Sequence, residues 1–376
     1  STLRAAMAAM SLQKGDLEGA GELLRGTPLE AMDEPLIHIQ WGRLHLASAD
    51  LQRDGTGDTD LRLLLVAKES FDEAVRLNRE HGIAWLGLAR IQRLLKDKEA
   101  AALSLTRASR LLEEDQPAFS TEAALLALDN DDIAEAERLI ENASIHDNRS
   151  ATIPYIKGNI AGARGRFEVA RSFYSETLAI EPNHSRAMLN RAACSMALDE
   201  AHLSLDDCNS LLERAPGLLL ARLRRAEASM HLTEWDEAIK DLETVLEINP
   251  KHSHALTRLA ACQIALGLPE LAETPLNEAL RVDSGNAEAW YQRGLLYMEW
   301  ERIDAAIADF QKAAKANPTH LQSRLHIAAS LHGAGRWEEA VDAWKEVLEL
   351  EPENNVARRR HDQAETFLSA PIETSE

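Results

Sequence analysis

Five prolines recur in this chain at multiples of 34 residues. They are Pro182, Pro216, Pro250, Pro318 and Pro352. A long period of this kind is typical of a repeat architecture, in which each repeat is a small structural unit stacked on its neighbours. Counting back 31 residues from each proline places repeat starts near residues 151, 185, 219, 287 and 321. The same spacing supplies further starts near 253, 117 and 82 and, less regularly, near 35 and 1.

Small residues mark two places in each repeat, once an insertion in the second repeat is allowed for. Two antiparallel helices can approach closely only where their side chains are small. The proline that closes a repeat cannot continue a helix. The sequence therefore predicts an all-α fold of helix-turn-helix repeats. The eighth places hold Ala8, Gly42, Ala89, Ala124, Gly158, Ala192, Ala226, Ala260, Gly294 and Ala328, and the twentieth hold Ala20, Ala67, Ala101, Ala136, Ala170, Ser204, Ala238, Ala272, Ala306 and Ala340.

One repeat carries the whole pattern, at residues 287–318: AEAWYQRGLLYMEWERIDAAIADFQKAAKANP. In its small places, large places and final proline it resembles the tetratricopeptide repeat (TPR) family, and the resemblance covers residues 1–354. The resemblance implies a right-handed superhelical solenoid of about ten helix-turn-helix repeats. It also implies a C-terminal capping helix, which we expect at residues 355–368, with Val356, Phe367 and Leu368 covering the last repeat. Residues 369–376 are expected to be disordered.

Two features depart from the repeat pattern. The second repeat carries DLQRDGTGDTDL, an insertion near residues 52–60 that we expect to form a flexible polar loop. Its Asp54, Asp58 and Asp60 suggest calcium binding, but the glycine and distal glutamate of a calcium loop are missing from their places. Pro275 falls inside the second helix of its repeat, where it is expected to kink the helix or shift its start.

Composition excludes several functions. The formal net charge of -21 argues against nucleic acid as a partner, and no run of about 18 apolar residues exists that would span a membrane. We find no catalytic signature and no cofactor motif, so we expect a protein that is not an enzyme. Asp206, Asp207 and the other acidic pairs of second helices are interpreted as solvated, and His252 and His254 as solvated turn residues rather than metal ligands.

The three cysteines, Cys194, Cys208 and Cys262, show no metal-like spacing and are expected to be small core residues. With so few cysteines, a reducing, cytoplasmic location fits best.

The resemblance also suggests where a partner binds. In this family the first helix of each repeat lines a concave surface, and the residues at places 2, 5, 6 and 9 commonly reach a bound peptide. A polar, partly basic stripe occupies such places here, so we expect a protein or peptide partner, acidic or carrying a C-terminal carboxylate. The same side chains are equally compatible with an ordinary solvated helix surface. The stripe comprises Asn159, Arg186, Asn190, Arg224, Arg258 and Gln292.

A narrower resemblance concerns residues 151–252, which are similar to co-chaperone TPR domains of the J-domain type. Those domains clamp a carboxylate with two lysines, two asparagines and an arginine. Asn159, Asn190 and Arg224 match, whereas Tyr155 and Leu220 stand at the lysine places, and the His-Pro-Asp signature of a J domain is absent from the sequence. The leading interpretation is a protein-interaction scaffold that binds a peptide or partner segment in its concave groove. A chaperone adaptor is the more specific form of this interpretation. The alternatives are the substrate-recruiting arm of a larger enzyme and a bacterial assembly or secretion scaffold.

Overall fold

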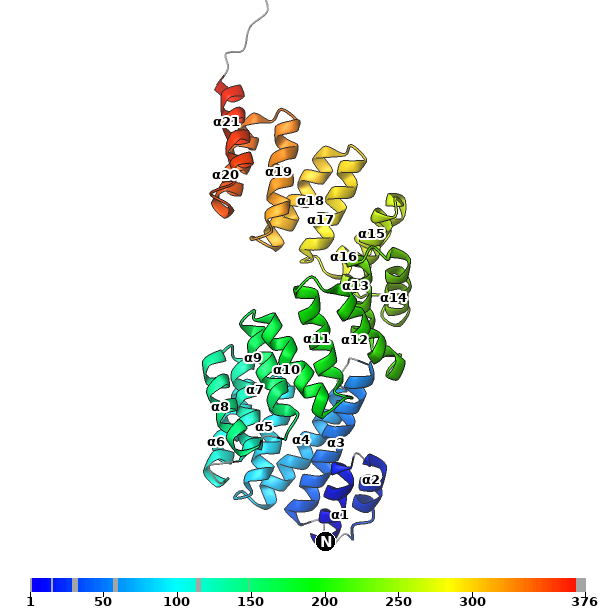
Figure 1. The fold of residues 1–376 in the computed structure, drawn as a ribbon, viewed down its shortest axis with the longest axis vertical. Coiled ribbons are helices and arrows are strands. Elements are labelled where there is room, and N and C mark those ends of the chain that lie inside the picture. Colours follow the sequence, from blue (N-terminus) through cyan, green and yellow to red (C-terminus); the bar gives the residue numbers. More distant parts are fainter. Residues whose placement is uncertain are drawn as a thin grey trace, which may run out of the picture. The chain divides into compact units, whose positions relative to one another are not determined.

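The structure, a computed structural model, describes residues 2–14, 16–28, 33–56, 60–112, 116–147 and 149–369. These residues form 21 α-helices and no strand. The chain divides into two compact units, residues 1–228 and 229–376, and each unit is built from antiparallel helix pairs stacked in chain order (Figure 1). No helix among the described residues is both long and apolar enough to cross a lipid bilayer.

Helices of 12 to 14 residues dominate both units. Unit 1 contains α1 (Thr2–Gln13), α2 (Leu17–Arg25), α3 (Pro35–Thr56), α4 (Leu61–Leu77), α5 (Gly82–Leu94), α6 (Lys98–Leu111), α7 (Pro117–Asp129), α8 (Ile133–His146), α9 (Thr152–Ala163), α10 (Phe167–Ile180), α11 (Ser185–Ala197), α12 (Ala201–Arg214) and most of α13 (Leu219–His231). Unit 2 continues with α14 (Trp235–Ile248), α15 (Ser253–Ala265), α16 (Pro269–Val282), α17 (Ala287–Glu299), α18 (Ile303–Ala316), α19 (Leu321–Gly333), α20 (Trp337–Leu350) and α21 (Asn355–Ser369).

Close helix approach at the small places holds each pair together. Ala306 of α18 is fully buried, and so is Phe310 one turn later. The ring of Phe310 lies against Gly294 of α17 so closely that a Cβ atom there would stand 2.5 Å from Cε1. Gly158 of α9 meets Tyr174 of α10 at the same distance. The small residue on one helix thus admits the large residue of its neighbour.

A left-handed residue joins the two helices of eight hairpins, always at the fifteenth place of the repeat. Only three of these residues are glycines, Gly165, Gly267 and Gly335. The others are Lys96, Asp131, Asp199, Thr233 and Glu301, with φ between 56° and 63°. The turn geometry is therefore imposed by the stacking of the helices, even where the side chain disfavours it.

The flexible loop expected near residues 52–60 is mostly helical in the structure. Its first helix, α3, continues through Thr56, and α4 begins at Leu61, so both helices are longer than their counterparts and take up most of the insertion. The run Leu51-Gln52-Arg53 consists of good helix formers, which favours extension of the helix over a loop. Residues 57–59 and the side chains of 51–59, which include Asp54 and Asp58, lie outside the described residues. Asp60, the third aspartate considered for calcium, caps the start of α4, where its Oδ1 accepts from the N–H of Arg62 at 2.8 Å.

Pro275 does not shift its helix. Helix α16 starts at Pro269, 34 residues after Trp235 of α14 and 34 before Ile303 of α18, and runs through Pro275 to Val282. Pro269 occupies the first turn, where a missing N–H costs nothing.

The last helix, α21, packs against α20 through residues other than those we expected. Ala357 and Ala364 are fully buried in the final core cluster. Val356, Phe367 and Leu368 are all exposed, although the ring of Phe367 stacks on Trp337 with ring centroids 4.6 Å apart. Small residues again decide the packing, because α21 lies close to its neighbour. A disordered tail was expected at residues 369–376, but Ser369 is the last residue of α21. Residues 370–376 are outside the described part of the chain.

Candidate binding cavity

Unit 1 contains a cavity of about 570 Å³ on the side of its first helices. Five of these helices, α3, α5, α7, α9 and α11, contribute to the wall, together with Phe71 of α4 and the turns that precede α9 and α11. Apolar, uncharged polar and charged residues all line it. The charged ones are four arginines and four acids: Arg43, Arg90, Arg93, Arg186, Asp50, Glu122, Asp147 and Glu181.

Asp50 of α3 lies at the centre of the charge arrangement. Arg90 of α5 donates from Nη2 to Oδ2 of Asp50 at 3.0 Å. Arg186 of α11, 136 residues further along the chain than Asp50, donates from Nη2 to Oδ1 at 2.8 Å. One carboxylate therefore joins three first helices across the cavity. This junction also forms part of the wall of a second cavity of about 420 Å³, which reaches toward α1.

Arg93 and Glu122 form a different kind of pair. Their side chains are only 12% and 8% exposed, and the Arg93 Nε donates to Glu122. Arg93 also donates from Nη1 to Asp129 at 3.2 Å. Burial alone would lower the pKa of Arg93, but the two carboxylates outweigh it and raise this pKa. The pair fastens α5 to α7 and leaves neither charge available to a ligand.

Arg43 lines both cavities, and the structure shows no ion pair or hydrogen bond for its guanidinium among the described residues. Its surroundings lower the pKa of Arg43 through desolvation, although the side chain remains accessible from the concave side. Arg43 and Arg90 occupy the ninth place of successive repeats, one of the places that the family resemblance singles out. That shared place is a sequence signal for this cavity, which the predicted stripe of binding residues does not include.

Of the six predicted binding residues, Arg186 is the one that lines the cavity. Asn159 and Asn190 bond to each other instead, because the Asn190 Nδ2 donates to the Asn159 Oδ1 at 3.1 Å. The Tyr174 hydroxyl donates to the same oxygen at 2.9 Å. Burial raises the pKa of Tyr174, so this hydroxyl stays protonated and acts as a donor. The three side chains connect α9, α10 and α11.

The remaining three predicted residues have separate surroundings. Arg224 donates from Nη1 to Glu227, one turn along α13, at 3.1 Å. Arg258 and Gln292 belong to unit 2. Gln292 donates to Glu288 at 2.8 Å, whereas the Nε of Arg258 is buried without a hydrogen-bond partner among the described residues.

Asp207 is not the solvated acid we expected. Both of its oxygens accept from Arg191, at 2.6 and 2.9 Å, and its side chain is buried. Asp309 and Arg293 repeat this fork in unit 2 at the same places of their repeat. An arginine at place 7 and an aspartate at place 23 was thus a recurring signal that a search for isolated acidic pairs missed.

The cysteines are free and buried, as expected for core residues. Burial raises the pKa of Cys208 to about 12 and that of Cys262 to about 11, which keeps both thiols protonated and unreactive near neutral pH.

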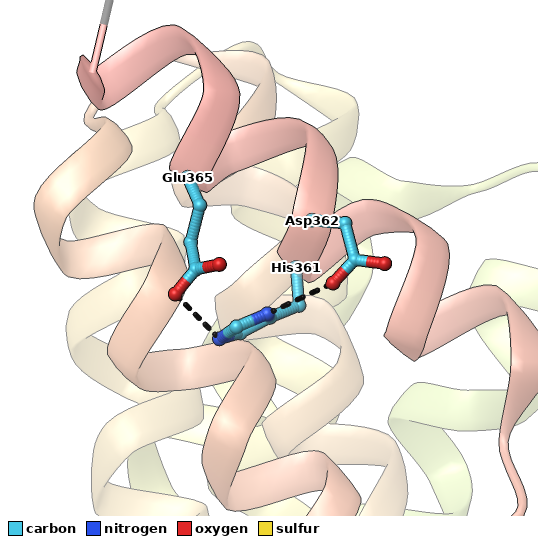
Figure 2. Close-up of side chains that lie close together, drawn as sticks. All are labelled: His361, Asp362 and Glu365. Atoms are coloured by element: carbon cyan, nitrogen blue, oxygen red, sulfur yellow. Dashed lines mark hydrogen bonds and ion pairs between the residues drawn. The ribbon is translucent and has the colours of Figure 1, made fainter.

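One cluster of potential metal ligands occurs among the described residues, and it lies on a single turn of α21 (Figure 2). His361 Nδ1 lies 3.4 Å from Asp362, and its Nε2 lies 3.7 Å from Glu365. The two acids are exposed, and the two contacts use opposite nitrogens of the ring. We therefore interpret the cluster as a surface ion-pair group.

Comparison with known families identifies the repeats. Three models, each described as tetratricopeptide repeat, match residues 60–115 and 121–185, residues 230–296, and residues 287–320. The chain belongs to the tetratricopeptide repeat family. Its repeats indicate a protein-interaction scaffold.

Relatives with known names share part of the chain. Human DnaJ homolog subfamily C member 7 is 23% identical over 238 residues, which cover 57% of this chain and 47% of that protein. The probable UDP-N-acetylglucosamine–peptide N-acetylglucosaminyltransferase SPINDLY of Hordeum vulgare is 30% identical over 115 residues, covering 29% of this chain and 12% of that one. The chain thus spans less than half the length of these relatives.

Solved structures agree in fold. The APC/C Cut9–Hcn1 hetero-tetramer aligns with a TM-score of 0.57 at 13% identity, over 96% of this chain and 83% of the other. PilF of Pseudomonas aeruginosa aligns with a TM-score of 0.50 at 15% identity, over 60% and 98%. At these identities the likeness concerns the fold alone.

Proposed function

We propose that this protein is a non-enzymatic scaffold that holds a segment of a partner protein in the unit 1 cavity. The observation that carries the proposal is the cavity itself, lined by the first helices of five successive hairpins. Leu46, Leu86, Leu94 and Leu125 offer apolar surface there, and arginines surround them. Apolar walls with a few fixed polar groups are typical of binding sites. The buried, unpaired cysteines support a reducing, cytoplasmic location.

Arg186 is the predicted residue best placed for this role. For Asn159 and Asn190 we favour a structural role, since their mutual hydrogen bond fixes two repeats together. Arg224, Arg258 and Gln292 remain proposed partner contacts outside the cavity. Among them Arg258 is the strongest, because its buried Nε has no partner among the described residues.

The chaperone-adaptor version is supported by the similarity to human DnaJ homolog subfamily C member 7. It predicts recognition of a C-terminal carboxylate. Tyr155, at one lysine place of the clamp, lines the cavity, and Leu220, at the other, is exposed. A peptide with a free C-terminus and its amidated form should then differ in affinity by about tenfold or more. Equal affinities would exclude this version and leave the side-chain groove in place.

The alternative of a substrate-recruiting arm of a larger enzyme has one supporting observation. SPINDLY, a relative named as a glycosyltransferase, shares part of this chain's repeats. Detecting the same partner segment as a substrate of an enzyme that contains or accompanies this chain would favour it. The third interpretation, a bacterial assembly or secretion scaffold, has no separate support in the structure.

Filling the cavity tests the proposal. Thr121 of α7 lines the cavity, and its hydroxyl bonds to the carbonyl of Ala118 at 3.0 Å. Ser109 of α6 makes the same bond to Thr106 at 3.0 Å but is exposed outside the cavity. A peptide library displayed on phage is selected on the purified chain, and the selected peptides are measured with Thr121→Trp and Ser109→Trp. We expect Thr121→Trp alone to abolish binding, and peptides that bind both variants equally would contradict the proposal.

A further inference from the structure

We infer that Asp50 occupies, from within the chain, the place of a partner's carboxylate, so that the cavity binds an acidic polypeptide segment by displacing Asp50 from Arg90 and Arg186. This inference rests on the proposed function and adds the chemical class of the partner and a built-in competitor. The supporting geometry is that each oxygen of Asp50 accepts from a different arginine inside the cavity wall.

Exposure indicates that this junction can exchange. The side chain of Asp50 is 25% exposed, and those of Arg90 and Arg186 are 44% and 35% exposed. Ion pairs so open to water contribute little net stability, because the separated charges are well solvated. The neighbouring pair of Arg93 and Glu122 is nearly buried, so breaking it would leave a buried charge without its partner. The cavity thus contains one fixed pair and one that a ligand can replace.

Charge around the cavity favours an incoming anion. Arg43 lies in the same wall as Asp50 and Arg90 and has no ion pair among the described residues. Of the other acids, Glu122 is held by Arg93, and Asp147 accepts from the backbone N–H groups of Arg149 and Ser150. Arg43, Arg90 and Arg186 therefore stand in the cavity wall beside the carboxylates of Asp50 and Glu181. A partner carboxylate that replaces Asp50 would form the same charge-assisted hydrogen bonds with Arg90 and Arg186, and Arg43 stands in the same wall.

The surroundings select a polypeptide rather than a nucleic acid or a free anion. The chain's formal net charge of -21 repels a polyphosphate, with a charge on every unit, more strongly than a segment with a few carboxylates. Within the cavity, Leu46 stands in the same wall as Asp50, and Leu86, Leu94 and Leu125 stand nearby. An acidic side chain flanked by apolar ones matches this combination of guanidinium groups and leucines.

The experiment measures fluorescence anisotropy of a labelled peptide that alternates Glu, Leu and Ser, with a second peptide carrying Gln in place of Glu. Asp50→Asn removes the internal competitor. It should raise the affinity for the Glu peptide by about tenfold and leave the affinity for the Gln peptide unchanged. Arg90→Gln and Arg186→Gln should each lower the affinity for the Glu peptide by about tenfold or more. Asp72→Asn is the matched control, since Asp72 pairs with Lys68 on α4 at 2.7 Å, away from the cavity.

Arg43→Gln provides a variant with no ion pair to lose, so it should fold like the parent chain and still weaken the Glu peptide. If Asp50→Asn leaves the affinity for the Glu peptide unchanged or lowers it in a folded protein, Asp50 has only a structural role and the inference is wrong. Binding of inorganic phosphate that excludes the Glu peptide would also overturn it. These results differ from failure of the proposed function, in which Thr121→Trp has no effect on any selected peptide.

Discussion

Arg293 and Asp309 form a two-pronged ion pair between α17 and α18, with N···O distances of 2.7 and 3.0 Å. The aspartate side chain is 4% exposed. Arg293→Leu would leave this buried carboxylate with only Lys312, whose Nζ lies 3.6 Å from Oδ1, so we expect a loss of about 3 kcal/mol in the free energy of unfolding. The measurement is urea denaturation followed by circular dichroism.

The chain itself suggests the control for that prediction. Another repeat has Leu259 and Pro275 where Arg293 and Asp309 stand, so the pair can be absent altogether. The double variant Arg293→Leu, Asp309→Ala should therefore lose less stability than Arg293→Leu alone. A double variant that loses the sum of both single effects would mean that the two charges do not stabilise each other.

A methyl group at Gly294 should destabilise unit 2. The added Cβ would stand 2.5 Å from the buried ring of Phe310, so Gly294→Ala is expected to cost about 1–3 kcal/mol. Adding Phe310→Leu should recover part of the loss by opening space. Gly333→Ala is the control, because no atom lies within 4 Å of the new Cβ at that helical position. Equal melting temperatures for Gly294→Ala and Gly333→Ala would contradict the packing.

The helices were predictable from the sequence because their signals are local. Alanine and glycine at fixed places set where two helices touch, and proline sets where a repeat closes. Helix α3 escaped prediction because Gly55 and Gly57 suggest a turn, whereas the residues before them favour helix. The left-handed turns at place 15 were also hidden, since Lys96 and Thr233 carry no turn signal of their own.

The cavity was predictable only in part. Asp50 and Arg186 are 136 residues apart, and only the stacking of the intervening helices brings them together. No spacing rule connects such a pair. For Asn159 and Asn190 the sequence predicted the location but not the contact. Their places in the repeat indicated a concave surface, but the sequence could not show that their amides bond to each other.

Thr233 should be replaceable by glycine with a gain in stability. It holds φ of 62°, a left-handed conformation that a β-branched residue adopts at a cost of about 1–2 kcal/mol. Glycine avoids that cost but loses more backbone entropy, so Thr233→Gly should gain about 0.5–1 kcal/mol. The reverse change at the equivalent place, Gly335→Thr, should destabilise. A calorimetric melting point that does not rise for Thr233→Gly would contradict this account of the turn.

Acidification should weaken unit 2 through His326. Its ring stacks on Phe310 with centroids 5.1 Å apart, and burial lowers the pKa of His326 below its ordinary value. A histidine with a lowered pKa binds fewer protons in the folded state than in the unfolded state. Its contribution is therefore present above the ordinary histidine pKa of about 6.5 and is lost as the pH falls through the lower, folded value.

The measurement is the free energy of unfolding between pH 7 and pH 5, determined for the parent chain and for His326→Gln. We expect a smaller decrease for the variant than for the parent chain. His202→Gln is the control, because His202 is exposed on α12. Identical slopes for the parent chain and His326→Gln would show that other groups cause the acid sensitivity.

Replacing Asn190 tests whether this residue has a structural role or a binding role. Its Nδ2 donates to Asn159 at 3.1 Å, in a group that also contains the hydroxyl of Tyr174. Asn190→Ala should cost about 1 kcal/mol of stability. In a double-mutant cycle it should couple to Asn159→Ala, because either change breaks the same bond. For peptides selected on the cavity, the variant should retain the parent affinity at temperatures where it is fully folded. A tenfold loss of affinity with no change in the unfolding free energy would instead place Asn190 in contact with the partner, as the carboxylate-clamp interpretation requires.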